Sequence, residues 1–399
     1  MTPRGRSVLA LGVVVYLTAW AFGSKPLYPV SVGLLVVSAL AWFWVHLGRQ
    51  SFRLHRRAGD RELFEGDEAS IRLKLESLGR APLATVEVVE RIDRLGEQRH
   101  VLRRFGGALR IDYVLPALRR GRYSYDDVHA ELSDPFGLQR VHVRLPSPGA
   151  LLVYPRIVPV DRLFSEAGSQ ALDGRRTPLL RNRGSELHSV REHVEGESLR
   201  RVHWPSTARR GRLMVREVED SPRDEIAVLL DADPRAVCGE SFDLQVRAAA
   251  SILAGYVSRS RRAVLVVNSS LLQAEQVHSA GSEWHQALDL LAAVQPDAHE
   301  PLVSVLRTQT SPAARALELV VVTARVDAPL VAQLVQRSLA RRRVSLVYVD
   351  AGTFVGASPR REPALLRLQA AGVAVATIRA GDDLRQCLEG EVHAEAARA

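Results

Sequence analysis

Cysteine and lysine are nearly absent from this sequence of 399 residues. Cys238 and Cys387 are its two cysteines and stand far apart, which excludes a disulfide framework and a four-cysteine metal site and fits a reducing compartment. Lys25 and Lys74 are its two lysines, so almost all of the positive charge comes from arginine. Because this bias runs through the whole chain, a single arginine carries little functional information and a cluster carries more.

Motifs of the common nucleotide-binding and hydrolytic sites are also missing. The sequence has no Gly-x-x-x-x-Gly-Lys phosphate loop, no Gly-x-Gly-x-x-Gly after a strand and no Gly-x-Ser-x-Gly elbow. His188, His193 and His203 do not predict a zinc site, because spacings of five and ten residues do not place them on one helical face and no cysteine lies nearby. The sequence therefore nominates no catalytic residue and no required cofactor, and it favours a protein that is not an enzyme.

The overall balance is that of a folded, basic protein. Hydrophobic residues make up 46% and charged residues 25%, which is ordinary for globular chains and allows two or three domains. The formal charge of +9 and the pI near 10.1 favour contact with anionic surfaces. A membrane is the first candidate for that surface, and nucleic acid is the second.

Two apolar runs, residues 7–22 and 27–47, contain no charged side chain. Each approaches the ~20 residues that cross a hydrocarbon core, so we expect a transmembrane hairpin within residues 1–50, with helices over 7–23 and 27–47. Arginines flank it on both sides, at Arg4, Arg6, Arg49, Arg53, Arg56 and Arg57. This predicts a protein of the cell inner (cytoplasmic) membrane with its soluble domains in the cytoplasm. A cleaved signal peptide is the alternative for the first run, but no small-residue cleavage site precedes the second.

The soluble part changes its pattern along the chain. Between residues 60 and 155, short segments alternate apolar with polar residues and are separated by turn residues, which predicts a small antiparallel β-sandwich. These segments are residues 71–76, 83–90, 110–115 and 141–145. Residues 156–220 form a linker, and residues 221–399 alternate wholly apolar runs with amphipathic helices. That alternation predicts a doubly wound α/β domain.

The predicted parallel strands and helices can be placed along that α/β domain. The strands are residues 226–231, 263–268, 317–323, 344–350 and 373–378, and the helices are residues 242–258, 283–294, 329–341 and 382–388. Binding sites in such sheets lie at the carboxyl ends of the strands. Those ends are Asp231, Asn268, Thr323 and Asp350.

The linker contains a distinctive segment, residues 184–217. Its notable positions are Gly184, Arg191, Gly196, Glu197, Arg200, His203, Trp204, Ser206, Ala208 and Arg209. This arrangement resembles the signature of domain-of-unknown-function family 58, and the stretch from Asp134 to Leu138 is also similar to that family's β region. The departures are Leu187 for an aromatic residue, His193 for tyrosine, Glu197 for aspartate, and Thr207 between Ser206 and Ala208.

The resemblance implies more about architecture than about activity. It implies a von Willebrand A-like fold for the α/β domain, a bacterial origin, and association with MoxR-type AAA+ ATPases. Without the resemblance, the arginines of this segment stand beside Glu192, Glu195, Glu197 and Glu217, so they form either an internal ion-pair network, which we favour, or an anion-binding patch. Trp204 is expected to be a packing anchor that fixes the segment on the α/β domain.

The loop after the first parallel strand is the place where integrin-type A domains bind Mg²⁺, through Asp-x-Ser-x-Ser. Here the loop reads Asp231-Ala-Asp233-Pro-Arg235, so a cation stands where a metal needs an oxygen. Thr323 is also followed by Ala324 rather than by an aspartate. We therefore expect no bound metal, with Asp231 and Asp233 as the ligands if Mg²⁺ does bind.

Three functions follow as hypotheses. The favoured one is a membrane-anchored scaffold or adaptor that binds partner proteins, with a MoxR-type AAA+ ATPase as the expected partner. The second is a divalent-metal-dependent binder or enzyme at Asp231 and Asp233. The third is a binder of anionic lipid or nucleic acid through the arginines of residues 175–216, with nucleic acid not favoured.

Overall fold

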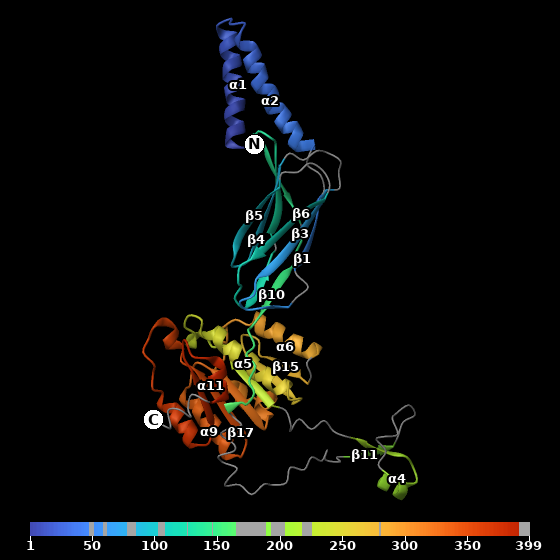
Figure 1. Cartoon of the computed structure of the whole chain (residues 1–399), viewed down its shortest axis with the longest axis vertical. Coiled ribbons are helices and arrows are strands. Elements are labelled where there is room, and N and C mark those ends of the chain that lie inside the picture. The colour runs from blue at the N-terminus through green and yellow to red at the C-terminus, as the bar shows by residue number, and fades with distance from the viewer. Residues whose placement is uncertain are drawn as a thin grey trace. The chain divides into compact units, whose positions relative to one another are not determined.

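The computed structural model describes residues 1–47, 52–58, 62–77, 85–102, 108–125, 127–145, 147–164, 189–192, 204–217, 226–278 and 281–390. The chain divides into two compact units, Met1–Tyr154 and Pro155–Ala399. Figure 1 shows the first unit in blue to green and the second in green to red.

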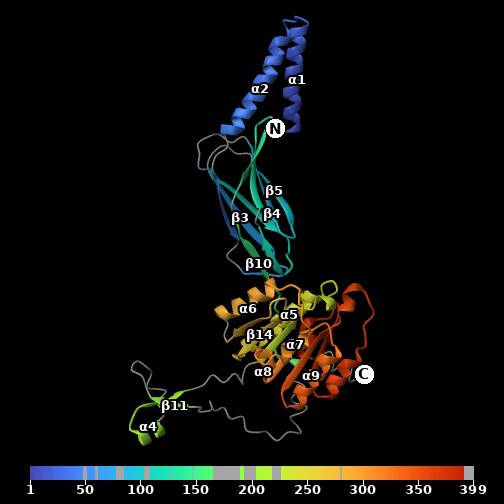
Figure 2. The ribbon, with the colours of Figure 1, turned by 180° about the vertical axis from the view of Figure 1, so that it is seen from behind.

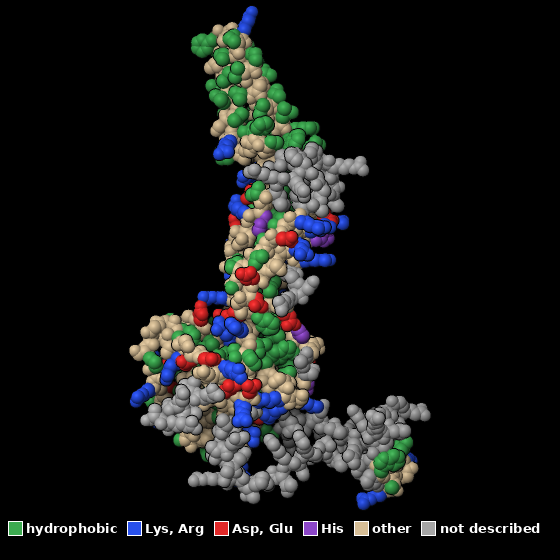
Figure 3. Space-filling view, viewed as in Figure 1, with side chains coloured by type: hydrophobic (Ala, Val, Ile, Leu, Met, Phe, Trp, Pro, Cys, Tyr) green, Lys and Arg blue, Asp and Glu red, His purple; other side chains and the backbone are tan. Residues whose placement is uncertain are grey.

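The first unit begins with two helices, α1 (Pro3–Ala21) and α2 (Leu27–Leu47). Both are long and apolar enough to cross a membrane. Figure 3 shows hydrophobic side chains over most of their visible surface, with basic side chains near the two ends of the hairpin. A helix satisfies its own backbone hydrogen bonds, which is the condition for lying in lipid. Both predicted helices are present: α2 has the predicted bounds 27–47, whereas α1 begins earlier than predicted, where Thr2 caps it, and ends at Ala21 rather than at residue 23.

Small residues line the contact between the two helices. Gly12 and Ala19 are buried on α1, and Ser31 and Ser38 are buried on α2, in each case seven residues apart. A spacing of seven keeps these residues on one helix face, and their size lets the two backbones approach closely. A Cβ atom added at Gly12 would lie 3.2 Å from side chains of α2.

The described residues of the first unit that follow α2 form ten strands. They are β1 (Phe52–Ala58), β2 (Leu63–Phe64), β3 (Ala69–Ser77), β4 (Thr85–Ile92), β5 (Gly96–Leu102), β6 (Ala108–Leu115), β7 (Gly121–Ser124), β8 (Asp127–Ser133), β9 (Arg140–Arg144) and β10 (Ala150–Tyr154). They form three sheets of order β1-β3-β6, β2-β10-β7 and β5-β4-β8-β9. The pairings are antiparallel except that of β2 with β10, which is parallel. The inward side chains of these sheets form one apolar core cluster.

The segments 71–76 and 110–115 predicted as strands lie within β3 and β6. Of the segments 83–90 and 141–145, residues 85–90 lie in β4 and residues 141–144 in β9, and residues 83 and 84 lie outside the described residues. Strand β1 lies before residue 60, where the sequence places the start of the β domain. Its pattern is hard to recognise because Phe52 and Leu54 alternate with charged residues and the inward position after them is Arg56. That arginine is almost fully buried, and its guanidinium pairs with Glu90, which is fully buried.

The second unit contains a six-stranded sheet. Its strands are β13 (Ile226–Asp231), β14 (Ala263–Asn268), β15 (Gln273–Val277), β16 (Glu318–Thr323), β17 (Arg343–Val349) and β18 (Ala374–Ile378). Their order is β15-β14-β13-β16-β17-β18, and all are parallel except the edge strand β15. The order reverses between β13 and β16. In open α/β sheets this reversal creates a crevice at the carboxyl ends of the strands.

Helices cover both faces of this sheet, as Figures 1 and 2 show from opposite sides. They are α5 (Ser241–Val257), α6 (Ser282–Ala293), α7 (Leu302–Arg307), α8 (Pro312–Arg315), α9 (Ala328–Leu339), α10 (Pro363–Ala370) and α11 (Leu384–Glu389), with short 3₁₀ turns η3 (Pro234–Ala236) and η4 (Ala351–Val355). Ile226, Val228 and Leu230 pack in a core with α5, α6 and α11, whereas Ala227 and Leu229 pack with α7 to α10. The doubly wound α/β prediction is confirmed at this level.

A small element lies in the region predicted as a linker. Strands β11 (Ser189–Glu192) and β12 (Met214–Glu217) pair antiparallel, and helix α4 (Trp204–Arg210) precedes β12. The hydroxyl of Thr207 accepts a hydrogen bond of 3.0 Å from the N–H of Met214, which ties α4 to β12. Met214 is buried inside this element.

Candidate functional site at the carboxyl edge of the sheet

The carboxyl edge of the parallel strands brings together the polar residues that the sequence indicates. Strand β13 ends at Asp231, β14 at Asn268 and β16 at Thr323, and Asp350 directly follows β17. All four are almost fully buried, with at most 4% of their surface exposed. Strand ends predicted from apolar runs therefore do meet at one edge. Asp233, in the loop after β13, joins them and is also buried.

Asp231 is held by neutral donors. Asn268 Nδ2 donates to its Oδ1 at 3.2 Å, and the hydroxyl of Thr323 donates to its Oδ2 at 2.7 Å. Burial raises the pKa of Asp231 above its ordinary value, although these hydrogen bonds act in the opposite direction. The side chains on the two neighbouring strands thus fix the orientation of this carboxyl group.

Asp233 is held by cations. Arg235 Nε lies 2.8 Å from Oδ1 and Arg235 Nη2 lies 2.8 Å from Oδ2, and the backbone N–H of Arg235 donates to Oδ1 at 2.9 Å. Arg325, two residues after β16, approaches Oδ2 to 3.4 Å. Desolvation would raise the pKa of Asp233, but the hydrogen bonds from Arg235 and the charges of both arginines outweigh it and lower the pKa.

This donor set does not fit a hard divalent cation. Mg²⁺ requires near-octahedral oxygen ligands, usually with several retained waters. The guanidinium of Arg235 is hydrogen-bonded to both oxygens of Asp233, and Arg325 adds a second positive charge on the same side. A planar guanidinium that pairs in this bidentate way has the position and the charge that a metal ion would otherwise supply. The described residues at this edge therefore have the composition of an ion pair rather than of a metal site.

Apolar side chains are exposed near the same edge. The loop after β14 presents Leu271 with 73% of its surface exposed and Leu272 with 50%. Val355, in η4 after β17, is 64% exposed. Large exposed apolar side chains beside fixed charges are a composition suited to protein contact.

The signature residues of the linker can be placed only in part. Gly184, Gly196, Glu197, Arg200 and His203 lie outside the described residues. Arg191 belongs to β11 and pairs in register with Val215 of β12, whereas Trp204, Ser206, Ala208 and Arg209 belong to α4. Trp204 is 67% exposed and Arg209 is exposed. The packing role expected for Trp204 and the ion-pair network expected for the arginines therefore stay predictions.

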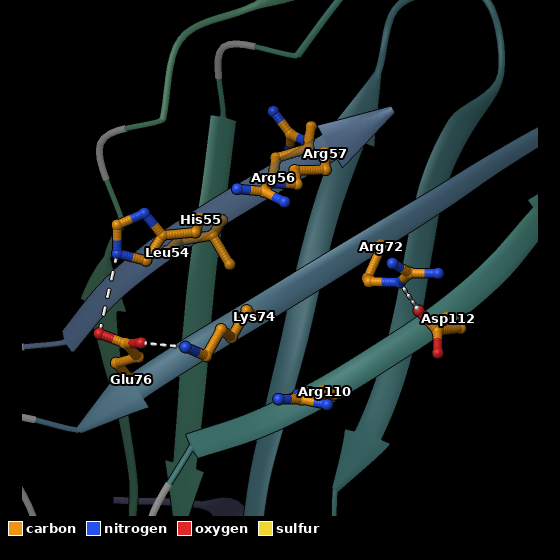
Figure 4. A pocket seen from close by; sticks show the side chains of 9 residues that line it. All are labelled: Leu54, His55, Arg56, Arg57, Arg72, Lys74, Glu76, Arg110 and Asp112. Carbon is orange, nitrogen blue, oxygen red and sulfur yellow. Dashed lines mark hydrogen bonds and ion pairs between the residues drawn. The ribbon is translucent and has the colours of Figure 1, made fainter. Parts of the chain in front are cut away.

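A second polar region lies on the outer face of the β1-β3-β6 sheet, which we call the basic face: His55, Arg57, Arg72, Lys74 and Arg110. Figure 4 shows these side chains around a hollow of about 830 Å³. The register sets cations directly opposite one another, Arg57 beside Arg72 and Lys74 beside Arg110. Like charges in this position repel, so the basic face favours an anion. The two carboxylates that line the hollow are Glu76, which pairs with Lys74, and Asp112, which pairs with Arg72.

Comparison with known proteins finds a family model that matches part of the second unit. The family model described as "Protein of unknown function DUF58" matches residues 189–349, which run from β11 to the end of β17. The chain is also a distant homologue of the uncharacterized protein YeaD of Bacillus subtilis (strain 168). The two are 24% identical over 284 residues, which cover 69% of this chain and 70% of YeaD.

Similarity to solved structures is slight. The alkylpurine DNA glycosylase AlkC of Pseudomonas fluorescens, bound to DNA containing an abasic site analog, is 16% identical over 29% of this chain and 38% of that chain, with a TM-score of 0.16. A beta-glucosidase of Listeria innocua in complex with glucose is 10% identical over 25% of this chain and 16% of that chain, with a TM-score of 0.15. The chain spans less than half of either structure. At these scores neither informs its fold or function.

Proposed function

We propose that this protein is a membrane-anchored scaffold or adaptor that faces the cytoplasm and binds a partner protein through the carboxyl edge of its α/β domain. The observation that carries the proposal is the pairing of Asp233 with Arg235 and Arg325. This pairing leaves a charged surface at the place where α/β sheets bind ligands. Leu271 and Leu272 border that surface with exposed apolar area.

The α/β domain is proposed to be von Willebrand A-like. The strand order, the parallel core and the single antiparallel edge strand β15 support this assignment. So do helices on both faces of the sheet. The family resemblance then makes a MoxR-type AAA+ ATPase the proposed partner, and the two apolar helices support attachment to the inner membrane.

Capture of the partner tests this function. The full chain, carrying a peptide tag at its C-terminus, is purified in mild detergent from its own host in the presence of ATP. We expect a MoxR-type AAA+ ATPase to co-purify in near-stoichiometric amount. Arg325→Ala, at the carboxyl edge, should reduce the yield of the ATPase. Arg343→Ala, at the opposite end of the neighbouring strand β17, is the matched control and should not. Absence of the ATPase from repeated preparations of the unaltered protein would contradict the proposal.

The metal-dependent alternative is tested at the same loop. Calorimetry of the full chain with Mg²⁺, which prefers oxygen ligands, should give no binding heat, because Arg235 is bound to Asp233. Arg235→Ser removes that cation and supplies a hydroxyl, which is a ligand that Mg²⁺ accepts. A clear binding heat for the unaltered protein, lost in Asp231→Asn, would favour the metal-dependent function instead.

A second candidate function is favoured by the basic face. Strand β1 begins at Phe52, shortly after α2 ends at Leu47, so the chain places this face close to the membrane end of the protein. Basic segments next to a membrane helix attract anionic lipid headgroups. We propose phosphatidylglycerol-type headgroups as the ligand, recognised by charge. This surface differs from residues 175–216, which the sequence suggests for such binding.

Stability in defined bilayers tests that second function. The protein is placed in nanodiscs of phosphatidylcholine with or without phosphatidylglycerol, and its unfolding temperature is measured at low and high salt. Binding to the folded state raises that temperature, and salt should weaken the effect. We expect the rise to be lost in Arg57→Ala with Arg110→Ala and kept in Arg307→Ala, a change on the second unit. An equal rise in the unaltered protein, the double variant and Arg307→Ala would exclude the basic face as the lipid-binding surface.

A further inference from the structure

A further cluster of titratable side chains lies on the outer face of the β5-β4-β8-β9 sheet of the first unit. His129 and Glu131 are two residues apart on β8 and so project from the same face of that strand. His142, on β9, is the direct cross-strand partner of Glu131. One ligand atom from each residue lies within 4.8 Å of the other two.

The distances within this cluster match those of a metal site better than those of hydrogen bonds. Oε1 of Glu131 is 3.4 Å from Nδ1 of His142 and 3.7 Å from Nε2 of His129. A hydrogen bond between nitrogen and oxygen spans about 2.7–3.2 Å. Ligand atoms that each lie about 2.0–2.2 Å from one zinc ion are roughly 3–3.5 Å apart. Both imidazole nitrogens therefore lie near one carboxylate oxygen at close to the spacing of ligands that share an ion, and the ligand atoms of the two histidines lie within 4.8 Å of each other.

The surroundings of the carboxylate are also those of a ligand. Glu131 is 6% exposed, and Arg140 Nη1 lies 2.9 Å from its Oε2, which leaves Oε1 directed at the two imidazoles. A ligating carboxylate is commonly held in this way by a partner outside the metal's own ligand set. Glu87 of β4 stands opposite Glu131 in register on the same face, and Arg99 Nη1 lies 3.9 Å from Oε1 of Glu87. Arg140 and Arg99 offset the two neighbouring carboxylates, and Oε1 of Glu131 is the oxygen that faces the imidazoles.

The ligand types indicate which metal would bind. Two imidazoles and one carboxylate suit a borderline transition metal such as Zn²⁺, whereas Mg²⁺ and Ca²⁺ prefer oxygen ligands. The His142 side chain is 60% exposed and that of His129 is 25% exposed, so the cluster faces solvent. Three protein ligands at an open surface leave a further coordination position for water or for a group from another molecule.

We propose that His129, Glu131 and His142 form a Zn²⁺-type transition-metal site, with Arg140 orienting the carboxylate and one coordination position open to solvent. The ion joins β9, the edge strand of its sheet, to the neighbouring strand β8. The site is independent of the proposed function at the α/β domain, because it lies wholly within the first unit.

Metal binding by the full chain tests this site. The protein is purified in detergent with a tag that contains no histidine and is stripped with a chelator. Zn²⁺ binding is then measured by calorimetry, and Co²⁺ binding by visible absorption, which depends on coordination geometry. We expect one Zn²⁺ per chain, with an affinity at least about 100-fold weaker in His142→Ala and in His129→Ala, since changes outside the ligand set alone cost 10–100-fold.

The chain offers a matched control in His55. Its side chain is also 60% exposed and lies 3.8 Å from a carboxylate oxygen of Glu76, but without a second histidine. His55→Ala should bind Zn²⁺ as the unaltered protein does and give the same Co²⁺ spectrum. Equal unfolding temperatures in chelator show that the variants are folded, and His142→Gln replaces the alanine variant if that variant is not. Equal affinity in the His55, His129 and His142 variants, or no binding to the unaltered protein at micromolar Zn²⁺, overturns the proposal.

Discussion

Arg235 holds Asp233 by a paired contact, with Nε 2.8 Å from one carboxylate oxygen and Nη2 2.8 Å from the other. The two residues are separated by Pro234 alone, in the loop that follows β13. The sequence places an arginine two residues after Asp233, and the structure shows that the Arg235 side chain turns back and pairs with the Asp233 carboxylate. The charge at the edge of the sheet is therefore fixed by the chain itself.

This contact predicts a pH dependence of stability. The pKa of Asp233 is lowered in the folded protein, so folding favours its ionised form. The stabilisation is complete above the pKa of the unfolded chain, near 4, and is lost as the pH falls through the lower folded value. Because the Arg235 side chain is 57% exposed, we expect this ion pair to contribute about 1 kcal/mol or less to the free energy of unfolding.

Thermal unfolding of the unaltered protein and of Asp233→Asn from pH 3 to pH 7 checks this prediction. The variant should unfold at lower temperature at pH 7, and the two curves should converge at the acid end. A difference between the two proteins that does not change with pH would contradict the ion-pair account.

Much of the α/β domain can be predicted from the sequence, for a physical reason. Strands buried on both faces have continuous apolar sequences, so β13 and β14 begin and end where the apolar runs at residues 226–231 and 263–268 do. Strand β15 escapes prediction because it is an exposed antiparallel edge strand with the polar sequence Gln-Ala-Glu-Gln-Val. The short helices α7, α8 and α10 are too brief to show a helical period.

The candidate sites are predictable to different degrees. Asp231 can be identified because it ends an apolar strand, but the approach of Arg325 depends on how the chain folds after β16. The cluster at Glu131 and His142 is not visible in the sequence, since the two residues meet only through the register of β8 and β9. Alternation of apolar residues predicts strands without specifying which residues face each other across them.

The buried ion pair of the β domain should be important for stability. Glu90 is fully buried, pairs with Arg56 and accepts a hydrogen bond of 2.5 Å from Tyr113, whose pKa is raised to about 12 chiefly by burial. Removing one partner leaves the other charge buried, which costs about 3–5 kcal/mol. Arg56→Met should therefore lower the free energy of unfolding of the first unit by about 3–5 kcal/mol.

Pulse proteolysis of the full chain in urea measures this effect, with cleavage within the first unit as the signal. The double change Arg56→Met with Glu90→Leu removes both charges and should recover much of the loss. Arg72→Met, at an exposed ion pair with Asp112, is the control and should cost less than about 1 kcal/mol. If Arg56→Met behaves like Arg72→Met, the buried pair is not a stabilising contact.

The hairpin predicts which side of the membrane each segment faces. Lys25 lies in the turn between α1 and α2, and Leu366 is 69% exposed on the α/β domain. In right-side-out vesicles of a Cys238→Ser background, a membrane-impermeant maleimide should label Lys25→Cys at once and Leu366→Cys after permeabilisation. The opposite pattern would reverse the orientation, and labelling of both positions in sealed vesicles would contradict a cytoplasmic α/β domain.

The most direct test compares two exposed leucines at opposite edges of the sheet. Leu271 follows β14 at the carboxyl edge and is 73% exposed, whereas Leu339 ends α9 just before β17 begins, at the amino edge, and is 74% exposed. A photo-crosslinking amino acid is placed at each position in turn, and the protein is irradiated in the membrane of living cells. The account predicts a crosslink from position 271 to a MoxR-type AAA+ ATPase and none from position 339. A crosslink from position 339 alone, or none from either position, would contradict it.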